Sequence, residues 1–216
     1  MTTKQLALDI GNVLCHVDFN RILNNLSKTL NISKNEAMYF LNRVQKLHDL
    51  GLTNLSDELK DYFKIRSEIV VEDILAEWNR AIQWDNDVIK QVARLKDKFD
   101  LEIALVSNIG IEHAAHLRNT VPDPVIGKAI HFFSCEVGAR KPSALYYKTF
   151  LDMYPQFKEC VYIDDLEENL NVGRKFGLNA IRFNLSDFKR SSLNNLLIGG
   201  SKISTFFTGL DNHFKS

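Results

Sequence analysis

Apolar residues recur at helical spacing through much of the first third of the chain, from about Asp18 to Gln83. A period of three to four residues places such positions on one face of a helix, so each stripe predicts an amphipathic helix. The stripes comprise Ile22, Leu23, Leu26 and Leu30, then Phe40, Val44 and Leu47, then Val71, Ile74, Leu75, Trp78 and Ile82. Ser56, followed by two acidic residues, fits the cap of another short helix.

After Trp84 the pattern changes to short apolar runs that alternate with helical stripes. Strands are predicted at 6–8, 101–106, 130–134, 160–163 and 179–183. Helices are predicted at about 88–99, at 112–118, from Pro142 onward and at 166–176. Such alternation is typical of a parallel sheet with helices on both faces. The predicted fold class is therefore α/β, a doubly wound parallel sheet formed by residues 1–16 and 85–216, with an inserted all-helical domain at 17–84.

The last part of the chain differs in composition from the rest. From about residue 189 onward, Asn, Ser and Gly dominate around a few apolar positions. We expect a weakly ordered tail or a small packed appendage there, without chemistry of its own.

The charges are balanced, with 27 lysine and arginine residues against 27 aspartate and glutamate residues. This balance argues against a general basic surface for nucleic acid or an anionic membrane. Every apolar run is far shorter than the about 18 residues of a membrane-spanning helix. We expect a globular protein, monomeric or homodimeric, whose partner is a small molecule and neither nucleic acid nor membrane.

The three cysteines, Cys15, Cys135 and Cys160, are odd in number and lack the spacing of a metal site. Free thiols in a reducing compartment are the simplest prediction. No histidine or carboxylate arrangement marks Cys15 or Cys135 as an activated nucleophile. The first residues, Met1 to Lys4, also lack a secretory signal pattern, so we expect a cytoplasmic protein.

Polar residues stand where several predicted strands end: Asp9, Ser107, Ser134 and Asp164. The carboxyl ends of parallel strands share one edge of the sheet, and ligands bind there at the switch in strand order. An ionised carboxylate at the end of a buried strand is costly unless something pairs with it or binds it. We therefore predict one shared site at this edge, which the helical insertion could cover.

Asp9, Ser107 and Asp164 belong to a series of four motifs in a fixed order: Asp9-x-Gly11-x-Val13, Ser107-Asn108, Lys141-Pro142 and Asp164-Asp165. This order resembles the haloacid dehalogenase-like (HAD) hydrolase superfamily, over roughly residues 5–185. The helical insertion looks like the C1-type cap of that superfamily. Within it, the first motif followed by Asp18-Phe19-Asn20-Arg21 is similar to bacterial α-D-glucose-1-phosphate phosphatases.

The resemblance implies a Mg²⁺-dependent phosphatase for a small phosphorylated metabolite, with a sugar 1-phosphate as one candidate. Asp9 would be the nucleophile that forms an aspartyl-phosphate, since a carboxylate is a recognised covalent catalyst. Mg²⁺ takes oxygen ligands and keeps several waters. Its expected ligands are the Asp9 carboxylate, the Gly11 backbone carbonyl, Asp164 and Asp165.

The remaining motifs would bind the phosphate group. Lys141 would place a compact positive charge beside Asp9 and the phosphate. The Ser107 hydroxyl, with backbone N–H groups of the Gly11 loop and near Asn108, would hold the phosphate oxygens. Asn169, just after the acidic pair, could orient it, although a solvated helix residue is a nearly equal alternative.

Gly11 departs from the superfamily pattern, in which most phosphatases carry an aspartate two positions after the nucleophile. That aspartate protonates the leaving oxygen and later activates water, and losing such a function costs about 10²–10⁴-fold in rate. The backbone carbonyl that would bind metal is unaffected by glycine. Either the leaving group needs little protonation, as for an anomeric sugar hydroxyl, or another group such as Asp18 or His16 substitutes.

Two other functions stay open. A 2-haloacid dehalogenase would attack carbon with the same aspartate and without metal, but the Asp164-Asp165 pair has no use there. A non-catalytic module that binds phosphate ligands would explain Gly11.

Further candidate residues lie outside the four motifs. Phe19 to Arg21 and His48 to Gly51 could face the substrate. His113 and His116 share a helical face, but a packing or surface role is favoured over metal binding.

Overall fold

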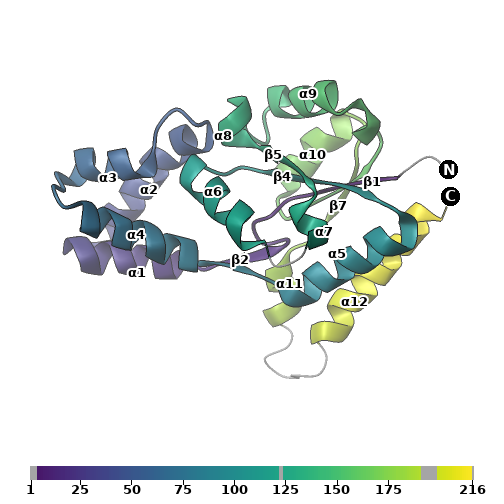
Figure 1. Ribbon diagram of the computed structural model, residues 1–216, viewed down its shortest axis with the longest axis horizontal. Coiled ribbons are helices and arrows are strands. Elements are labelled where there is room, and N and C mark those ends of the chain that lie inside the picture. Colours follow the sequence, from purple (N-terminus) through teal and green to yellow (C-terminus); the bar gives the residue numbers. More distant parts are fainter. Residues whose placement is uncertain (1–3, 122–123, 191–198, 216) are drawn as a thin grey trace.

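Five parallel strands form the sheet of this computed structural model, which describes residues 4–121, 124–190 and 199–215 (Figure 1). The strand order is β5-β4-β1-β6-β7, so the first strand lies at the centre. The strands are β1 (Gln5–Leu8), β4 (Glu102–Ser107), β5 (Ile130–Phe133), β6 (Val161–Asp164) and β7 (Asn179–Arg182). The direction of the crossovers reverses at β1, which creates a switch point beside it. The predicted α/β class is confirmed.

Helices cover both faces of the sheet, as the apolar character of β1 requires. Leu6 and Leu8 pack on one face, with Val88 and Val92 of α5 (Asn86–Phe99), whereas Ala7 faces the opposite layer. The first face also carries α6 (Ile111–Thr120), α7 (Pro124–Gly127) and α12 (Gly199–Gly209). The other carries α9 (Ala144–Met153) and α10 (Glu167–Lys175). Short elements complete the core: α8 (Ser134–Val137), η1 (Pro155–Phe157), α11 (Leu185–Arg190) and η2 (Leu210–Phe214).

Four helices lie to one side of this sheet and form what we call the helical insert (Figure 1). They are α1 (Phe19–Leu30), α2 (Lys34–Asp49), α3 (Leu55–Phe63) and α4 (Glu68–Arg80). Their apolar stripes meet in a separate cluster that includes Leu26, Phe40, Val44 and Ile74. The insert therefore has a hydrophobic core of its own.

A two-stranded antiparallel pair joins the insert to the sheet. β2 (Cys15–Val17) leads into α1, and β3 (Ile82–Trp84) returns from α4. The sequence did not predict this pair, because strands of three residues carry too little periodicity to detect. Since the two crossings lie side by side, the chain enters and leaves the insert at one narrow connection.

The C-terminal region contains a packed helix. Phe207, Leu210 and Phe214 are buried against the α5 face of the sheet. Of the two alternatives for the region after residue 189, the packed appendage is confirmed for residues 199–215; residues 191–198 lie outside the described part.

Several boundaries differ from the sequence prediction. The cap predicted at Ser56 is wrong, because α3 begins at Leu55 after Asn54 and Ser56 lies inside the helix. Ser143 caps α9 by accepting a hydrogen bond from Tyr146 N–H, so Pro142 precedes the helix instead of opening it. The predicted strand 130–134 is one residue shorter, because Ser134 begins α8.

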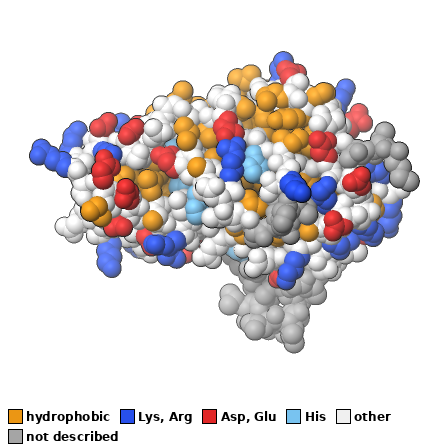
Figure 2. Space-filling view, viewed as in Figure 1, with side chains coloured by type: hydrophobic (Ala, Val, Ile, Leu, Met, Phe, Trp, Pro, Cys, Tyr) orange, Lys and Arg blue, Asp and Glu red, His pale blue; other side chains and the backbone are white. Residues whose placement is uncertain are grey.

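Acidic and basic side chains are interspersed on the face shown in Figure 2, over the insert as over the sheet layers. In the described ranges, no helix combines the length and the apolar character needed to cross a membrane.

Candidate active site

Strand register brings the two acidic motifs to one level at the carboxyl edge of the sheet. Leu8, at the end of β1, pairs with Leu105 of β4 on one side and with Ile163 of β6 on the other. Asp9 therefore emerges between these neighbouring strands, level with Asp164 at the end of β6. This is the position at the switch in strand order where ligands bind in open α/β sheets.

Three buried carboxylates gather here around one ammonium group. Oxygens of Asp9, Asp164 and Asp165 all lie within 4.8 Å of one another. Lys141 Nζ is 2.9 Å from Asp9 Oδ1 and 2.6 Å from Asp164 Oδ2, and its side chain is only 1% exposed. Three carboxylates thus share one positive charge away from water, which is costly unless more positive charge is bound. The donor set fits a hard divalent cation, which prefers carboxylate oxygens.

The members of this cluster differ in their electrostatics. Burial, partly offset by Lys141, raises the pKa of Asp9 to about 7, and burial also raises the pKa of Asp165. Burial opposes ionisation of Asp164 too, but the Lys141 ammonium outweighs it and holds the pKa of Asp164 below its usual range. Burial would lower the pKa of Lys141, yet Asp9 and Asp164 raise it far above its usual value. Lys141 is therefore charged, whereas full ionisation of Asp9 near neutral pH requires additional positive charge.

Amide side chains orient the acidic pair. Asn169 Nδ2 donates to Asp164 Oδ1 at 2.9 Å, the orienting contact considered from the sequence. Asn12 Nδ2 donates to Asp165 Oδ2 at 3.1 Å, a contact that the sequence analysis missed. The sequence did hold a signal for a tight turn here, because Asn12 directly follows a glycine. In the structure Asn12 has a φ of 54°, a left-handed conformation that asparagine tolerates.

Asn108 fixes the loop that carries Lys141. Its Nδ2 donates to the Lys141 carbonyl at 2.9 Å, and its Oδ1 accepts from the Lys141 N–H at 2.8 Å. Lys141 Nζ also donates to the Val106 carbonyl at 2.8 Å. The side chain of Asn108 is thus committed to positioning the lysine, while Ser107 beside it is buried at the end of β4.

Ser134 does not share this site, so the prediction that included it is wrong. β5 is the edge strand, separated from β1 by β4. The Ser134 hydroxyl accepts a hydrogen bond from Ile109 N–H at 2.9 Å and is fully buried. It anchors the loop that follows Ser107 and has no free face toward a ligand.

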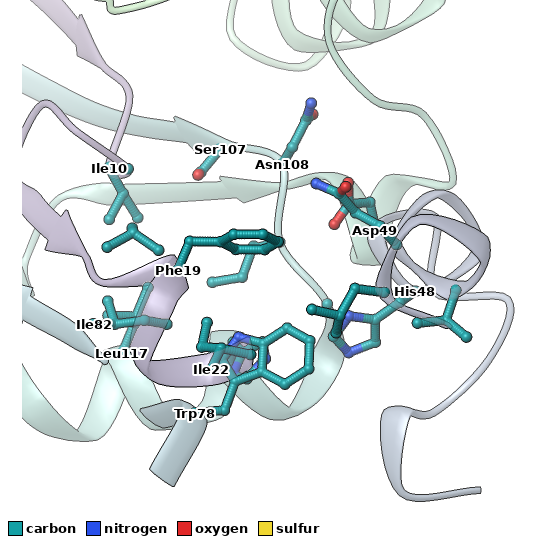
Figure 3. Close-up of a pocket in the computed structure, with 18 residues that line it drawn as sticks. Ile10, Phe19, Ile22, His48, Asp49, Trp78, Ile82, Ser107, Asn108 and Leu117 are labelled. Carbon is teal, nitrogen blue, oxygen red and sulfur yellow. The ribbon is translucent and has the colours of Figure 1, made fainter. Parts of the chain in front are cut away.

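A cavity of about 250 Å³ adjoins the carboxylate cluster, between the helical insert and the sheet. Figure 3 shows the rings of Phe19 and Trp78 turned toward the space that Ser107 and Asn108 bound from the sheet side. The other lining residues are Ile10, Gly11, Val17, Ile22, Leu41, Val44, Gln45, His48, Asp49, Ile82, Ile109, Gly110, His113 and Leu117.

The segments expected to face a substrate are represented in this cavity by Phe19, His48 and Asp49. Arg21 instead forms an ion pair with Glu77 at 2.8 Å within the insert.

Position 11 has room for a side chain. A β-carbon added to Gly11 would meet only Val17 Cγ2, at 3.9 Å, so packing does not demand glycine there. The substitutes considered for the missing acid are engaged elsewhere. Asp18 caps α1 by accepting from Arg21 N–H at 3.0 Å. His16 Nε2 lies 3.0 Å from Asp85 Oδ2, and neither His16 nor Asp18 lines the cavity.

The end of α2 fastens the insert to the sheet layers. His48 Nε2 lies 2.7 Å from Glu112 Oε2, at the start of α6. Glu112 also accepts from Ser56 N–H at 3.2 Å. Arg140, directly before Lys141, forms an ion pair with Asp49 at 3.0 Å. The cavity is therefore bounded on this side by polar contacts between buried or half-buried groups of the insert and the sheet layers.

Other candidate groups have packing roles. His113 Nδ1 lies 2.9 Å from Asn79 Oδ1, and burial lowers the pKa of His113 to about 3. The three cysteines are free thiols. Burial raises the pKa of Cys135 to about 11 and that of Cys160 to about 12, so these thiols stay protonated. Within the described ranges, the aspartate cluster is the one group of three or more side chains arranged to hold a metal ion.

Comparison with known proteins gives similarity in structure but not in sequence. No protein-family model matches the chain, and no curated protein matches it. A HAD family enzyme from Bacteroides thetaiotaomicron, solved in complex with magnesium and inorganic phosphate, superposes with a TM-score of 0.71 at 22% identity, over 83% of this chain and 93% of that one.

Two further solved structures extend the similarity. A predicted HAD-like family hydrolase from Porphyromonas gingivalis gives a TM-score of 0.66 at 16% identity, over 91% of this chain and 98% of that one. An L-2-haloacid dehalogenase gives a TM-score of 0.58 at 16% identity, over 82% of this chain and 83% of that one. Identities this low establish shared architecture only, and this chain therefore has the HAD-like fold.

Proposed function

We propose that this protein is a Mg²⁺-dependent phosphatase that cleaves a small phosphate monoester through an aspartyl-phosphate on Asp9. The observation that carries the proposal is the cluster of Asp9, Asp164 and Asp165 around Lys141 at the switch point of the fold. Transfer of a phosphoryl group depends on charge neutralisation and in-line positioning more than on acid–base chemistry.

Each group of the cluster has a role in this chemistry. Asp9, Asp164, Asp165 and the Gly11 carbonyl would hold Mg²⁺, which when bound neutralises phosphate charge. One Asp9 oxygen attacks phosphorus, and Lys141, held 2.9 Å from Asp9, stabilises the added negative charge.

Phosphate binding and access fall to the neighbouring groups. We assign the Ser107 hydroxyl and the backbone N–H groups of the Gly11 and Asn108 loops to the phosphate oxygens. We further propose that residues 17–84 act as the cap, with 1–16 and 85–216 as the catalytic core. Figure 1 shows the insert beside the edge where these strands end, which supports this division.

A screen of phosphorylated metabolites, sugar 1-phosphates included, tests the proposal. Phosphate release is expected with Mg²⁺, with little after chelation, and with none in Asp9→Asn. Binding of phosphate compounds without turnover would instead indicate a non-catalytic module.

A 2-haloacid dehalogenase is the second candidate, favoured by the haloacid dehalogenase among the similar structures and by the apolar cavity. The paired acids argue against it, since attack on carbon leaves them without a cation to bind. Halide release from 2-chloropropionate that is independent of Mg²⁺ would reverse this order.

A further inference from the structure

The cavity beside the carboxylate cluster is built for an apolar occupant. Ten of its eighteen lining residues are Ile, Leu, Val, Phe or Trp, contributed by both the insert and the sheet side. An apolar cavity of about 150 Å³ already accepts benzene, so about 250 Å³ accommodates a substituted ring. Gly11, Ser107 and Asn108 belong to the same wall, so this space continues from the phosphate site.

Several polar side chains of the wall have protein partners, although Asp49 Oδ2 and His113 Nε2 are buried without a hydrogen bond. Both ends of the Asn108 amide bond the Lys141 backbone. His48 is paired with Glu112, and Asp49 with Arg140. A sugar would bring several hydroxyl groups into this space, and each buried hydroxyl without a partner costs free energy. An apolar ring makes no such demand.

The surroundings of Gly11 are also apolar. In place of an acid, position 11 presents a hydrogen, and the nearest atom to a β-carbon placed there would be Val17 Cγ2, at 3.9 Å. Burial leaves His113, in the same wall, neutral, with a pKa lowered to about 3. Because no side chain is placed at position 11 to deliver a proton, a leaving group that can depart as an anion is favoured, and a phenol-type hydroxyl departs in this way far more readily than a primary alcohol.

We propose that the substrate is the phosphate monoester of a small, apolar, aromatic or enol-type hydroxyl compound. This inference rests on the proposed phosphatase function. An Asp9 oxygen bonds to phosphorus while the ester P–O bond breaks, and the bonding electron pair leaves with the aryloxide, which then takes a proton from water. Water next attacks phosphorus, the electron pair of the Asp9–phosphorus link returns to the carboxylate, a proton passes to solvent, and phosphate departs.

Four substrates separate ring binding from leaving-group acidity. Phenyl phosphate has an aromatic ring and an acidic leaving hydroxyl, whereas benzyl phosphate has the ring with a primary alcohol. Glucose 1-phosphate has an anomeric hydroxyl and no aromatic ring. Acetyl phosphate needs neither binding of a ring nor protonation of its leaving group. We expect kcat/KM for phenyl phosphate to exceed that for benzyl phosphate about 10²-fold or more, the usual worth of a general acid. We expect kcat/KM for phenyl phosphate to exceed kcat/KM for glucose 1-phosphate about tenfold or more.

Two variants locate these effects. Gly11→Asp should narrow the gap between phenyl and benzyl phosphate, since it restores a proton donor where there is room for one. Phe19→Ser should lower kcat/KM for phenyl phosphate more than for acetyl phosphate, because Phe19 lines the cavity. Tyr39→Ser is the matched control, since Tyr39 is an exposed aromatic residue of the same insert that lies outside the cavity wall.

The outcomes distinguish the two proposals. If acetyl phosphate is hydrolysed with Mg²⁺ but glucose 1-phosphate matches or exceeds phenyl phosphate, the aromatic substrate class is wrong while the phosphatase stands. Benzyl phosphate turned over as fast as phenyl phosphate would also overturn the aromatic substrate class, because the leaving oxygen would then receive a proton from another group. If none of the four is hydrolysed, the phosphatase proposal itself fails.

Discussion

Lys141 carries much of the balance of charge at the candidate site, because its ammonium group is the positive charge bonded to both Asp9 and Asp164. Replacing it by methionine keeps the length of the side chain but leaves two buried carboxylates without their counter-charge. Removing one partner of a buried ion pair typically costs about 3–5 kcal/mol. We expect Lys141→Met to unfold at correspondingly lower urea concentration and to lose activity.

Lys148→Met is the matched control for that experiment. Lys148 pairs with Asp152 on the surface of α9, where both side chains are more than half exposed. An exposed pair of this kind contributes about 0–1 kcal/mol. Equal losses of stability in the two variants, measured by urea unfolding, would show that the buried ion pairs of Lys141 contribute no more stability than an exposed pair.

His113 predicts a dependence of stability on pH. Burial lowers its pKa from the ordinary 6.5 to about 3, so as the pH falls below 6.5 the unfolded chain binds a proton that the folded chain does not. The stability that depends on neutral His113 is therefore complete above pH 6.5 and is lost progressively down to about pH 3. Between pH 7.5 and 5 the loss should reach about 2 kcal/mol.

His113→Phe removes this titration while keeping a ring beside Trp78 and His48. Between pH 7.5 and 5, the decrease in the free energy of unfolding should be about 2 kcal/mol smaller for the variant than for the parent protein. Parallel pH profiles from denaturant titrations would mean that His113 is protonated as easily in the folded protein as in the unfolded chain.

Among single residues, those with a charged or motif-bound role were predictable from sequence. Asp9, Lys141 and Asp164 are brought together as their order along the chain suggested. The pairing of Asn12 with Asp165 was not foreseen, because Asn12 stands at an unassigned position of the first motif and its sequence context indicated a turn but no partner. Ser134 was misassigned because its strand end was recognised but not its place at the sheet edge.

At the scale of elements, the turn after α2 joins the insert to the sheet layers. Gly51 has a φ of 68°, and a β-carbon there would collide with the carbonyl oxygen of Cys135. We expect Gly51→Ala to displace this turn and lower stability by about 1–3 kcal/mol or more, as strained backbone does. Thermal unfolding measures the loss, and proteolysis of the 48–56 segment reports the displacement.

Gly138→Ala is its control, because Gly138 also has a positive φ, of 63°, but no atom lies within 4 Å of an added β-carbon. It bears the backbone cost of about 1–2 kcal/mol without the collision. A Gly51→Ala protein as stable and protease-resistant as Gly138→Ala would contradict a tight contact between the turn and Cys135.

Elements with a clear apolar pattern were predicted well. The stripes of α1, α2 and α4 have helical periodicity, and β1, β4 and β6 lie in short apolar runs that end in polar residues. β2, β3 and α8 have three or four residues each and are set by tertiary contacts. In α12, glycine and serine weaken the helical signal, and the burial of Phe207 and Leu210 compensates.

For the whole molecule, the proposed reaction depends on how two separately packed units meet. The insert and the sheet layers have distinct apolar clusters, and the cavity lies between them. The sequence indicated which residues form each unit, but the direction of side chains into the cavity depends on how the units meet. That is why substrate class could be inferred only from the structure.

The absence of a side chain at Gly11 affects both halves of the proposed reaction. The same position that would protonate the leaving group would also activate water for the second step. With a leaving group that departs without protonation, formation of the aspartyl-phosphate stays fast, whereas its hydrolysis is slow. An enzyme of this kind accumulates its covalent intermediate, and Gly11→Asp should reduce that accumulation.

The most direct measurement is to mix the protein with acetyl phosphate and Mg²⁺, stop the reaction with acid, and search the peptides for a bound phosphoryl group by mass spectrometry. The account predicts a phosphoryl group on the peptide that contains Asp9, present only with Mg²⁺ and absent from Asp9→Asn. Phosphate release without that modification, or the same modification in Asp9→Asn, would contradict nucleophilic attack by Asp9.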